Sequence, residues 1–432
     1  MRPLMKGEAA ADLLVIGGGA AGFFGAIAAA EEAREGGRIL ILEKTGRCLS
    51  KVAISGGGRC NVTHGLEDPE ELIRGYPRGH RELLGPLYRW GSRETIEWFE
   101  GRGCRLKREA DGRIFPVSDD SGSVISVLER EARKHGIEVR TRVDVVELVH
   151  GEGGLFTARS RDGGQWEAKR VLLAIGGLKG SPLAAELKRL GHRLAPLTPS
   201  LFTFKIRDRR LEDLAGISVD QAVVELEGLA PPEGRGMEGA RTQRGPVLVT
   251  HWGLSGPAVL KLSAWAARDL APTGYQFPLK VNWVGDLTAG EVEKGLEGLR
   301  REAGRSYVRN HCPFPLPKRL WQRLVESEGM GQDLTWGQVS RQQYQTLSQQ
   351  LVESRFDVLG KSTNKDEFVT AGGVELREVD FRTMESRCCP GLHLAGETLD
   401  IDGVTGGFNL QSAWTTGRIA GESIGKKVSA AF

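Results

Sequence analysis

Two glycine-rich segments lie near opposite ends of this 432-residue chain, each beside a carboxylate and each at the start of a predicted helix. The first, Gly17-Gly-Gly19-Ala20-Ala21-Gly22, follows the apolar run Leu13–Ile16 and opens an alanine-rich stretch. Glycines at this spacing let the N–H groups of a helix start approach a pyrophosphate. Glu43 ends the next apolar run, where its carboxylate can accept hydrogen bonds from an adenosine ribose. Together these residues predict a dinucleotide site.

The second segment adds groups that suit a flavin. A short apolar run ends in Gly396 and Glu397, and Gly407-Phe408-Asn409-Leu410 begins another predicted helix. Glu397 is placed to bind ribityl hydroxyls, and the helix N-terminus to stabilise negative charge on the pyrimidine edge of a reduced flavin. One dinucleotide held by both ends of a chain predicts FAD. The sequence has no second Gly-x-Gly-x-x-Gly strand, so it does not choose between NADPH and NADH as a transient electron donor.

Two further glycine motifs are expected beside the same cofactor. Gly56-Gly57-Gly58-Arg59-Cys60-Asn61 predicts a loop that bends over the cofactor, with Arg59 as a fixed positive charge. An ordinary tight turn is the alternative interpretation. Ala174-Ile-Gly176-Gly177 ends an apolar strand, where paired glycines let the backbone pass close to a ligand.

Three residues are candidate proton donors. His251 and Ser255 lie between an apolar strand and the helix-starting Pro257, where they either face a substrate or pack at a helix start. Cys60 is the first of the three candidates, ahead of His251 and Ser255, although a thiol beside Arg59 is expected to have a lowered pKa, which argues against proton donation. The six cysteines form no Cys-x-x-Cys and no ligand pair stands at i, i+4, so we predict no metal.

Composition excludes several classes of protein. The net charge is +3, and 40% of the residues are hydrophobic, as in an ordinary globular chain. No apolar run reaches about 18 residues, which predicts no membrane span. Cysteines without disulfide spacing predict a cytoplasmic location. Arginines interleaved with aromatic residues over 74–93, 207–210 and 305–323 favour RNA contacts, with a solvated arginine-rich surface as the alternative.

The order of predicted elements indicates a cofactor domain interrupted by an insertion. Residues 12–43 have the strand–helix–strand pattern of a Rossmann unit. From about residue 196 the chain alternates as strands do, and from about 289 it is helical and charged. We therefore predict residues 1–195 as the first part of an FAD-binding domain, 196–288 as a β-rich insertion, 289–365 as a helical subdomain and 366–432 as the second part of the FAD-binding domain.

Five segments carry a resemblance to a known family: Ser55–His64, Gly112–Val117, Thr250–Pro257, Thr370–Val374 and Gly396–Gln411. They are similar to segments of the bacterial aminoacetone-oxidase-like or bile-acid Δ4,6-reductase-like FAD-dependent oxidoreductases, which include ribosomal RNA dihydrouridine synthases. The resemblance implies an α/β fold, in which a glutathione-reductase-type FAD-binding Rossmann domain is split by an inserted β-barrel-like domain and a small helical domain.

The resemblance also implies which residues contact FAD. The corresponding positions are Gly17, Gly19, Gly22, Glu43, Lys44, the Gly56–Asn61 loop, the backbone near Val143, Gly176, Glu397 and the run from Gly407 to Leu410. One departure from the family pattern is Ile175, which stands where a threonine is usual and removes a hydroxyl near the cofactor.

The functions implied by the resemblance share one chemistry, hydride transfer from flavin N5 to an activated C=C bond. We expect the substrate to be a uridine of large-subunit ribosomal RNA or its precursor, reduced at C6 by the hydride and protonated at C5 by Cys60, His251 or Ser255. A small-molecule oxidase or enone reductase is the alternative. A non-catalytic, flavin-bearing protein that binds RNA or a partner is the second alternative.

Overall fold

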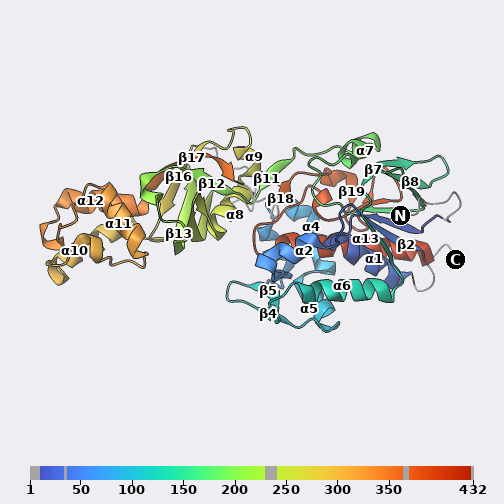
Figure 1. Ribbon diagram of the computed structural model, residues 1–432, viewed down its shortest axis with the longest axis horizontal. Coiled ribbons are helices and arrows are strands. Elements are labelled where there is room, and N and C mark those ends of the chain that lie inside the picture. Colours follow the sequence, from blue (N-terminus) through green and yellow to red (C-terminus); the bar gives the residue numbers. More distant parts are fainter. Residues whose placement is uncertain (1–9, 34–36, 229–240, 363–368, 430–432) are drawn as a thin grey trace. The chain divides into compact units, whose positions relative to one another are not determined.

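The computed structural model describes residues 10–33, 37–228, 241–362 and 369–429. The chain divides into two compact units, one formed by residues 1–199 and 365–432 and the other by residues 200–364 (Figure 1). A first unit made of both chain ends is what an inserted domain produces. The predicted boundaries at 195/196 and 288/289 remain predictions, and the one at 365/366 lies outside the described residues.

A seven-stranded sheet forms the centre of the first unit, in the order β19-β20-β21-β10-β1-β2-β6. The strands from β21 to β6 are parallel, and β19 and β20 are antiparallel. β1, β10 and β21 are buried along their whole length, as expected for parallel strands covered on both faces. The strands are β1 (Leu13–Ile16), β2 (Ile39–Glu43), β6 (Glu138–Thr141), β10 (Val171–Leu173), β19 (Val379–Asp380), β20 (Glu385–Ser386) and β21 (Leu392–Leu394).

Smaller sheets and helices complete this unit. Two antiparallel sheets contain β3 (Thr63–His64), β5 (Arg113–Pro116) and β4 (Leu106–Arg108), and β7 (Val145–His150), β8 (Phe156–Ser160) and β9 (Gln165–Ala168). β11 (Thr198–Ser200) pairs with β18 (Val369–Ala371), and nearby the Ala195 N–H donates to the Gly373 carbonyl at 2.8 Å. The helices are α1 (Ala20–Glu32), α2 (Ser50–Ile54), α3 (Pro69–Leu72), α4 (His80–Arg89), α5 (Ser92–Glu100), α6 (Gly122–Lys134), α7 (Leu183–Arg189) and α13 (Phe408–Ser429).

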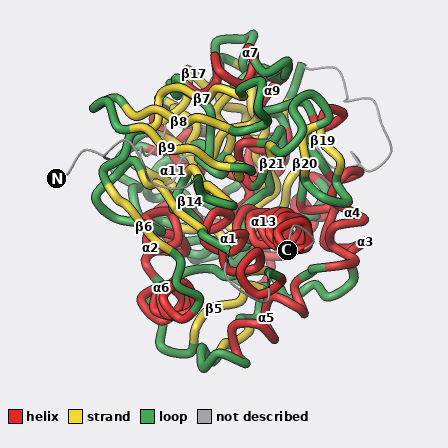
Figure 2. Tube along the Cα trace, turned by 90° about the vertical axis from the view of Figure 1, so that its right-hand side faces the viewer, coloured by secondary structure: helices red, strands yellow, loops and turns green. Residues whose placement is uncertain are grey.

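Helices α1 and α13 lie side by side, and small residues line their contact (Figure 2). A Cβ added to one of three α13 glycines would lie 2.2–2.6 Å from a carbonyl oxygen of α1; the pairs are Gly417 with Ala21, Gly421 with Gly25 and Gly425 with Ala29. Both series rise by four residues in the same direction, so the helices are parallel. Because Ala21 lies beside residue 417, α13 begins about two turns, ~12 Å, ahead of α1.

The second unit combines a closed barrel with helices around one core. The barrel order is β12-β15-β14-β13-β16-β17. One buried cluster joins barrel side chains such as Phe204 and Val281 to helical ones such as Leu296 and Trp321. The elements are β12 (Thr203–Ile206), β13 (Ser218–Leu226), β14 (Thr242–Thr250), β15 (Gly253–Ser255), α8 (Pro257–Trp265), α9 (Ala267–Leu270), β16 (Phe277–Asn282), α10 (Ala289–Glu302), α11 (Lys318–Ser327), α12 (Arg341–Val352) and β17 (Ser354–Ser362).

Within the described ranges, no helix combines the length and the apolar character needed to cross a bilayer.

Candidate active site

The first glycine motif forms a tight turn between β1 and α1. Gly17 has φ +110°, and a Cβ there would lie 2.3 Å from the Ala174 carbonyl oxygen. A Cβ at Gly22 would lie 2.0 Å from the Gly17 oxygen. A Cβ at Gly19 would meet no atom within 4 Å. Two of the glycines are therefore required by the fold itself, and the third borders open space at the helix start.

The N-terminus of α1 is suited to an anion. No side chain caps it, and its first turn, which includes Ala20 and Ala21, carries no acidic residue. The first N–H groups of a helix lack partners within the helix, and the helix dipole places partial positive charge there. A pyrophosphate beside Gly19 would satisfy both features.

The carboxylate of Glu43 lies directly beside this turn. Its two oxygens accept the N–H groups of Gly18 and Thr45, each at 2.8 Å. Thr45, which the sequence analysis did not single out, thus fixes the carboxylate proposed to bind the ribose. The Val143 N–H donates to the Glu43 carbonyl at 2.8 Å, so this buried residue adjoins the same strand end. Lys44 is mostly exposed and lies 3.6 Å from Asp144.

The N-terminus of α13 provides a second positive helix end. The loop before it is held by a buried ion pair between Arg78 and Asp402 and by the Tyr76 hydroxyl, which donates to the Phe408 carbonyl at 2.8 Å. Asn409 exchanges two hydrogen bonds with the Gly403 backbone. Because Asp402 is fully buried, the ion pair locks the position of the helix start.

The Asn61 side chain joins the triple-glycine loop to this helix start. Its amide lies 2.9 Å from the Gly407 nitrogen and 3.0 Å from the Thr63 carbonyl oxygen. A Cβ at Gly407 would lie 2.5 Å from that same oxygen, so only glycine fits there. Two sequence motifs that are more than 340 positions apart therefore meet in one place.

Glu397 lies in the 3₁₀ turn η7 (Gly396–Thr398) and has two firm partners. One carboxylate oxygen accepts the Thr370 N–H at 2.8 Å, and the other pairs with Lys51. A Cβ at Gly176 would approach both Glu397 and Lys51, at 3.7 and 3.9 Å, and a Cβ at Gly177 would lie 3.0 Å from Glu397. Gly396 has φ +65° and packs on Ala21. Sequence reasoning missed Lys51, which carries no motif of its own.

The predicted loop Gly56–Asn61 begins in a 3₁₀ turn, η1 (Ser55–Gly58), whose glycines Gly56 and Gly57 depart from helical backbone angles, and Arg59 faces other partners than a cofactor. Gly56, Gly57 and Gly58 all have positive φ, of 59°, 70° and 88°. The Arg59 guanidinium bonds Glu109 at 2.6 Å and lies over the Phe115 ring at 3.9 Å. Its charge is thus already neutralised within the protein, and its role at the cofactor remains a prediction.

The pKa of Cys60 differs from the value expected beside an arginine. The side chain is fully buried, and this burial raises the pKa of the thiol to about 12. The expectation of a lowered pKa is therefore wrong, because Arg59 turns toward Glu109 and the loss of hydration disfavours the thiolate. Cys60 remains a protonated thiol at neutral pH.

The two other candidate proton donors lie in the second unit, so the structure does not bring all three together within one unit. His251 is exposed at the turn between β14 and β15. The Ser255 hydroxyl accepts a hydrogen bond from Thr203 at 2.9 Å, and Pro257 begins α8 as predicted. Their catalytic roles remain predictions.

The arginine-rich clusters are largely used inside the protein. Arg78 pairs with Asp402, and Arg89 bonds the Arg382 carbonyl and Glu422. In the second unit, Arg210 pairs with Asp208 and stacks on Phe356; Arg319 bonds the Asp213 carbonyl, and Trp321 is buried. Many of these arginines are therefore paired with carboxylates or carbonyl groups of the protein, and Trp321 is part of a hydrophobic core. The clusters support RNA contact less strongly than their sequence pattern does.

The residues of the first unit fit FAD. Glu43 lies beside the α1 start and Glu397 beside the glycines that follow β10. The two positive helix ends are staggered by ~12 Å along one direction, which matches a pyrophosphate at α1 and a flavin ring at α13. In the first unit, Gly17–Gly22, Glu43, Gly176 and Glu397 would hold the dinucleotide, and the start of α13 would face the flavin.

This fold and arrangement define an FAD-dependent oxidoreductase, and comparison with known proteins agrees. The family described as HI0933-like protein Rossmann domain matches residues 11–423. The chain belongs to this family.

Curated relatives cover almost the whole chain. A 3-dehydro-bile acid delta(4,6)-reductase of Clostridium scindens is 30% identical over 409 residues, which are 93% of this chain and 96% of that protein. A ribosomal RNA dihydrouridine synthase of Escherichia coli is 29% identical over 412 residues, which are 94% and 96%. One of Haemophilus influenzae is 26% identical over 409 residues, which are 92% and 95%. The resemblance stated from the sequence is thus confirmed.

A solved structure shows the same fold. The 3-ketosteroid delta1-dehydrogenase of Sterolibacterium denitrificans, in complex with 1,4-androstadiene-3,17-dione, aligns with a TM-score of 0.50 and 13% identity, over 97% of this chain and 100% of that one. The predicted α/β fold class is confirmed, with the barrel and helices inserted into the Rossmann domain.

Proposed function

We propose that this protein reduces a uridine of large-subunit (23S) ribosomal RNA to dihydrouridine. Bound FAD, once reduced, supplies the hydride for the C=C bond of the base. NADPH or NADH serves as the electron donor, and the reaction takes place in the cytoplasm, where ribosomal RNA is found. Two curated relatives that match over nearly their full length carry this activity in their names, which supports the proposal.

The observation that favours RNA over a small substrate is the exposed indole of Trp252. It lies at the turn between β14 and β15, and 62% of its surface is accessible. The Lys205 ammonium lies 5.6 Å from the ring centroid. An exposed aromatic ring beside a cation suits a stacked base and its phosphate.

The backbone around Trp252 is firmly held. Its N–H donates to the Thr250 hydroxyl at 3.2 Å, and its carbonyl accepts the Ile206 N–H at 2.9 Å. A Cβ at the following Gly253 would lie 2.4 Å from the Phe204 carbonyl oxygen, so the turn packs directly on β12. The backbone that carries the indole is thus already ordered, so binding costs no conformational entropy for ordering this turn.

The first test uses the anaerobically reduced protein and unmodified 23S ribosomal RNA. We expect flavin reoxidation together with a gain of two hydrogens at one uridine, detected by mass spectrometry of the digested RNA. Trp252→Ala should weaken RNA binding by about 5–150-fold, because base stacking contributes about 1–3 kcal/mol per base, and should leave flavin reduction by NAD(P)H unchanged. Trp252→Phe is the matched control and should retain most of the affinity. RNA that is neither bound nor reduced would refute the proposal.

The proton donor is tested separately. Cys60 keeps its proton at neutral pH, but it is fully buried. A Cys60→Ala variant with full turnover would exclude Cys60 and leave His251 and Ser255 as candidates. A loss of turnover with normal FAD binding would support it as the donor.

A small-molecule enone reductase is the second candidate function. The relative that favours it is the bile-acid reductase, which is 30% identical over 93% of this chain. Rapid reoxidation by a steroid enone, with none by RNA, would establish this alternative.

A further inference from the structure

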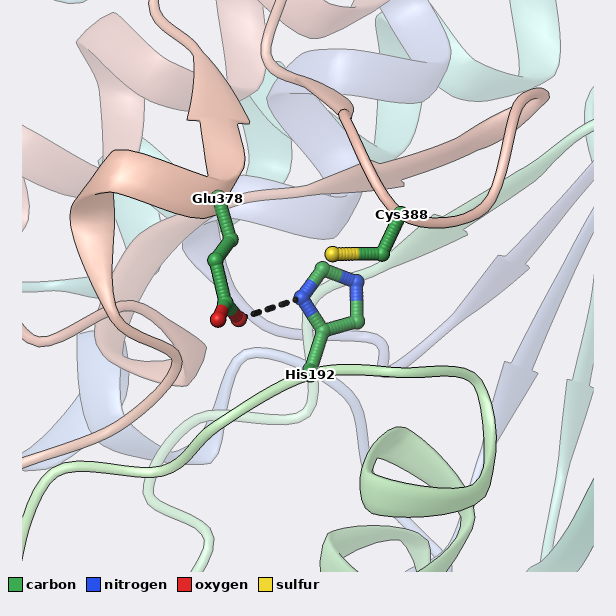
Figure 3. Close-up of side chains that lie close together, drawn as sticks. All are labelled: His192, Glu378 and Cys388. Atoms are coloured by element: carbon green, nitrogen blue, oxygen red, sulfur yellow. Dashed lines mark hydrogen bonds and ion pairs between the residues drawn. The ribbon is translucent and has the colours of Figure 1, made fainter.

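Three side chains from separate segments of the first unit converge outside the flavin site (Figure 3). His192 follows α7, Glu378 ends the 3₁₀ turn η6 (Leu376–Glu378), and Cys388 lies in the turn between β20 and β21. One potential ligand atom of each residue lies within 4.8 Å of the other two. His192 and Glu378 are buried, and Cys388 is exposed.

We propose that these three residues form a zinc site, with water as the fourth ligand. Imidazole nitrogen, carboxylate oxygen and thiolate sulfur are the ligand types that zinc takes in proteins. Ligand distances of about 2.0–2.3 Å in a tetrahedron place the ligand atoms roughly 3.3–3.8 Å apart. Nδ1 of His192 and Oε2 of Glu378 are 3.2 Å apart, so this pair is already near that geometry.

Hydrogen bonds from neighbouring groups orient both buried ligands. The Ser386 hydroxyl lies 2.9 Å from Nε2 of His192, the ring nitrogen that faces away from Glu378. The Arg193 N–H donates to Oε2 of Glu378 at 2.8 Å, and its side chain bonds Oε1 at 3.0 Å. Partners that fix the second ring nitrogen of a histidine and the tilt of a carboxylate are typical of metal sites.

The third ligand has freedom to complete the site. Cys388 is exposed, so its side chain can rotate toward the other two and an ion can enter from solvent. Its N–H donates to the Ser386 hydroxyl at 3.1 Å, which keeps the backbone of this turn close to His192.

Zinc binding requires a small rearrangement of protons. The ion would occupy the place of the hydrogen now shared between Nδ1 of His192 and Oε2 of Glu378. The ring proton moves to Nε2. The Ser386 hydroxyl, which now accepts the N–H groups of Cys388 and Cys389, must release the longer bond from Cys388 and turn its own hydrogen away from the ring in order to accept that proton. Cys388 loses its thiol proton to solvent. Without an ion, His192, Glu378 and Ser386 form a hydrogen-bonded clasp between the segment after α7 and the β19–β20 edge, and the experiment distinguishes these two states.

The test is cobalt(II) titration of the metal-stripped, FAD-loaded protein under reducing conditions. Cobalt is the probe because its ligand-field bands lie at longer wavelengths than flavin absorption, and a thiolate ligand adds a charge-transfer band. We expect one equivalent to bind with a thiolate signal, zinc to displace it, and zinc to raise the Tm.

Two neighbouring variants make the test specific. Cys388→Ser should abolish the thiolate signal and weaken zinc binding at least tenfold, because it removes one of three protein ligands. Cys389→Ser is the matched control and should retain the thiolate signal and the zinc affinity. Cys389 lies outside the cluster, and its sulfur contacts His150. Failure of the folded wild-type protein to bind cobalt, or an unchanged spectrum in Cys388→Ser, would overturn the zinc site and leave only the clasp.

Discussion

Glycine is used in two different ways in the first unit. Along α13, a Cβ on Gly417, Gly421 or Gly425 would strike backbone atoms of α1. At Gly19, Gly57 and Gly58, an added Cβ would meet nothing within 4 Å. The first set therefore brings two helices together, whereas the second borders space in which a ligand can lie. Spacing in the sequence does not separate these uses, but the surroundings do.

The largest effect is expected in the helix contact. A Cβ at Gly421 would lie 2.2 Å from the Gly25 carbonyl oxygen, so Gly421→Val should lower the free energy of unfolding by about 3–5 kcal/mol. Gly298→Val is the matched control, because Gly298 lies in the helix α10 with nothing within 4 Å. Urea denaturation measures both. Equal free energies of unfolding for Gly421→Val and Gly298→Val would show that a side chain fits between α1 and α13 without cost.

The next effect concerns binding rather than folding. Gly19 is the N-cap of α1 and has extended backbone angles, φ −91° and ψ −168°, so Gly19→Val should lower the free energy of unfolding of the apoprotein by only about 1 kcal/mol, the cost of a poorer helix cap. We expect its FAD affinity to fall about 10–100-fold, or ~1.4–2.7 kcal/mol, because the side chain enters the pyrophosphate space. Titration of the apoprotein with FAD gives the Kd. An unchanged Kd would place the pyrophosphate elsewhere.

His393 is a tightly packed position of the first unit that holds a buried titratable side chain in place of a glycine. Burial lowers the pKa of His393 to about 4, with Glu385 opposing this shift and Lys427 and Arg170 adding to it. In the unfolded chain the imidazole titrates at its ordinary pKa of about 6.5, whereas in the folded protein it stays neutral down to about pH 4. Between these two pH values the unfolded state binds a proton that the folded state does not. The free energy of unfolding therefore falls as the pH decreases from 6.5 to 4.

His393→Leu tests this pH dependence. Both ring nitrogens lack a hydrogen-bond partner in the part of the chain that the structure describes, so leucine leaves no partner unsatisfied. We expect the variant to lose less stability than the wild type between pH 6.5 and 4, measured by urea denaturation across that range, with unchanged FAD affinity. Identical pH profiles would exclude His393 as the cause.

The smallest effect is expected in the triple-glycine loop. Gly57 has φ +70° with open space around it, so Gly57→Ala should cost about 1 kcal/mol of stability from backbone strain alone. Gly57→Asn should cost less, because asparagine tolerates this conformation. A larger loss of FAD affinity than of stability would indicate that the loop also contacts the cofactor.

Local patterns predicted the cofactor framework well, because its information is local. The strand Leu13–Ile16, the glycine turn and the start of α1 follow one another directly, and hydrophobic periodicity with glycine spacing is enough to identify them. The helix start at Phe408 was predicted for the same reason.

Side-chain partners across long sequence distances were not predictable. Arg78 and Asp402 are 324 positions apart, and Lys51 and Glu397 are 346 apart. The pattern of arginines and aromatic residues resembled a nucleic-acid surface because sequence alone does not reveal which carboxylates neutralise them. The cluster of His192, Glu378 and Cys388 escaped notice likewise, since its members share no short spacing.

The junction of the two units has a consequence for how such enzymes diversify. The first unit ends at residue 199 and resumes at residue 365, and just inside these limits the Ala195 N–H donates to the Gly373 carbonyl at 2.8 Å. A Cβ at Gly372 would strike the Pro196 carbonyl oxygen, so the two crossings pack backbone to backbone. Recombination that preserves this backbone contact inside the first unit can replace the inserted barrel and helices without altering the Rossmann framework.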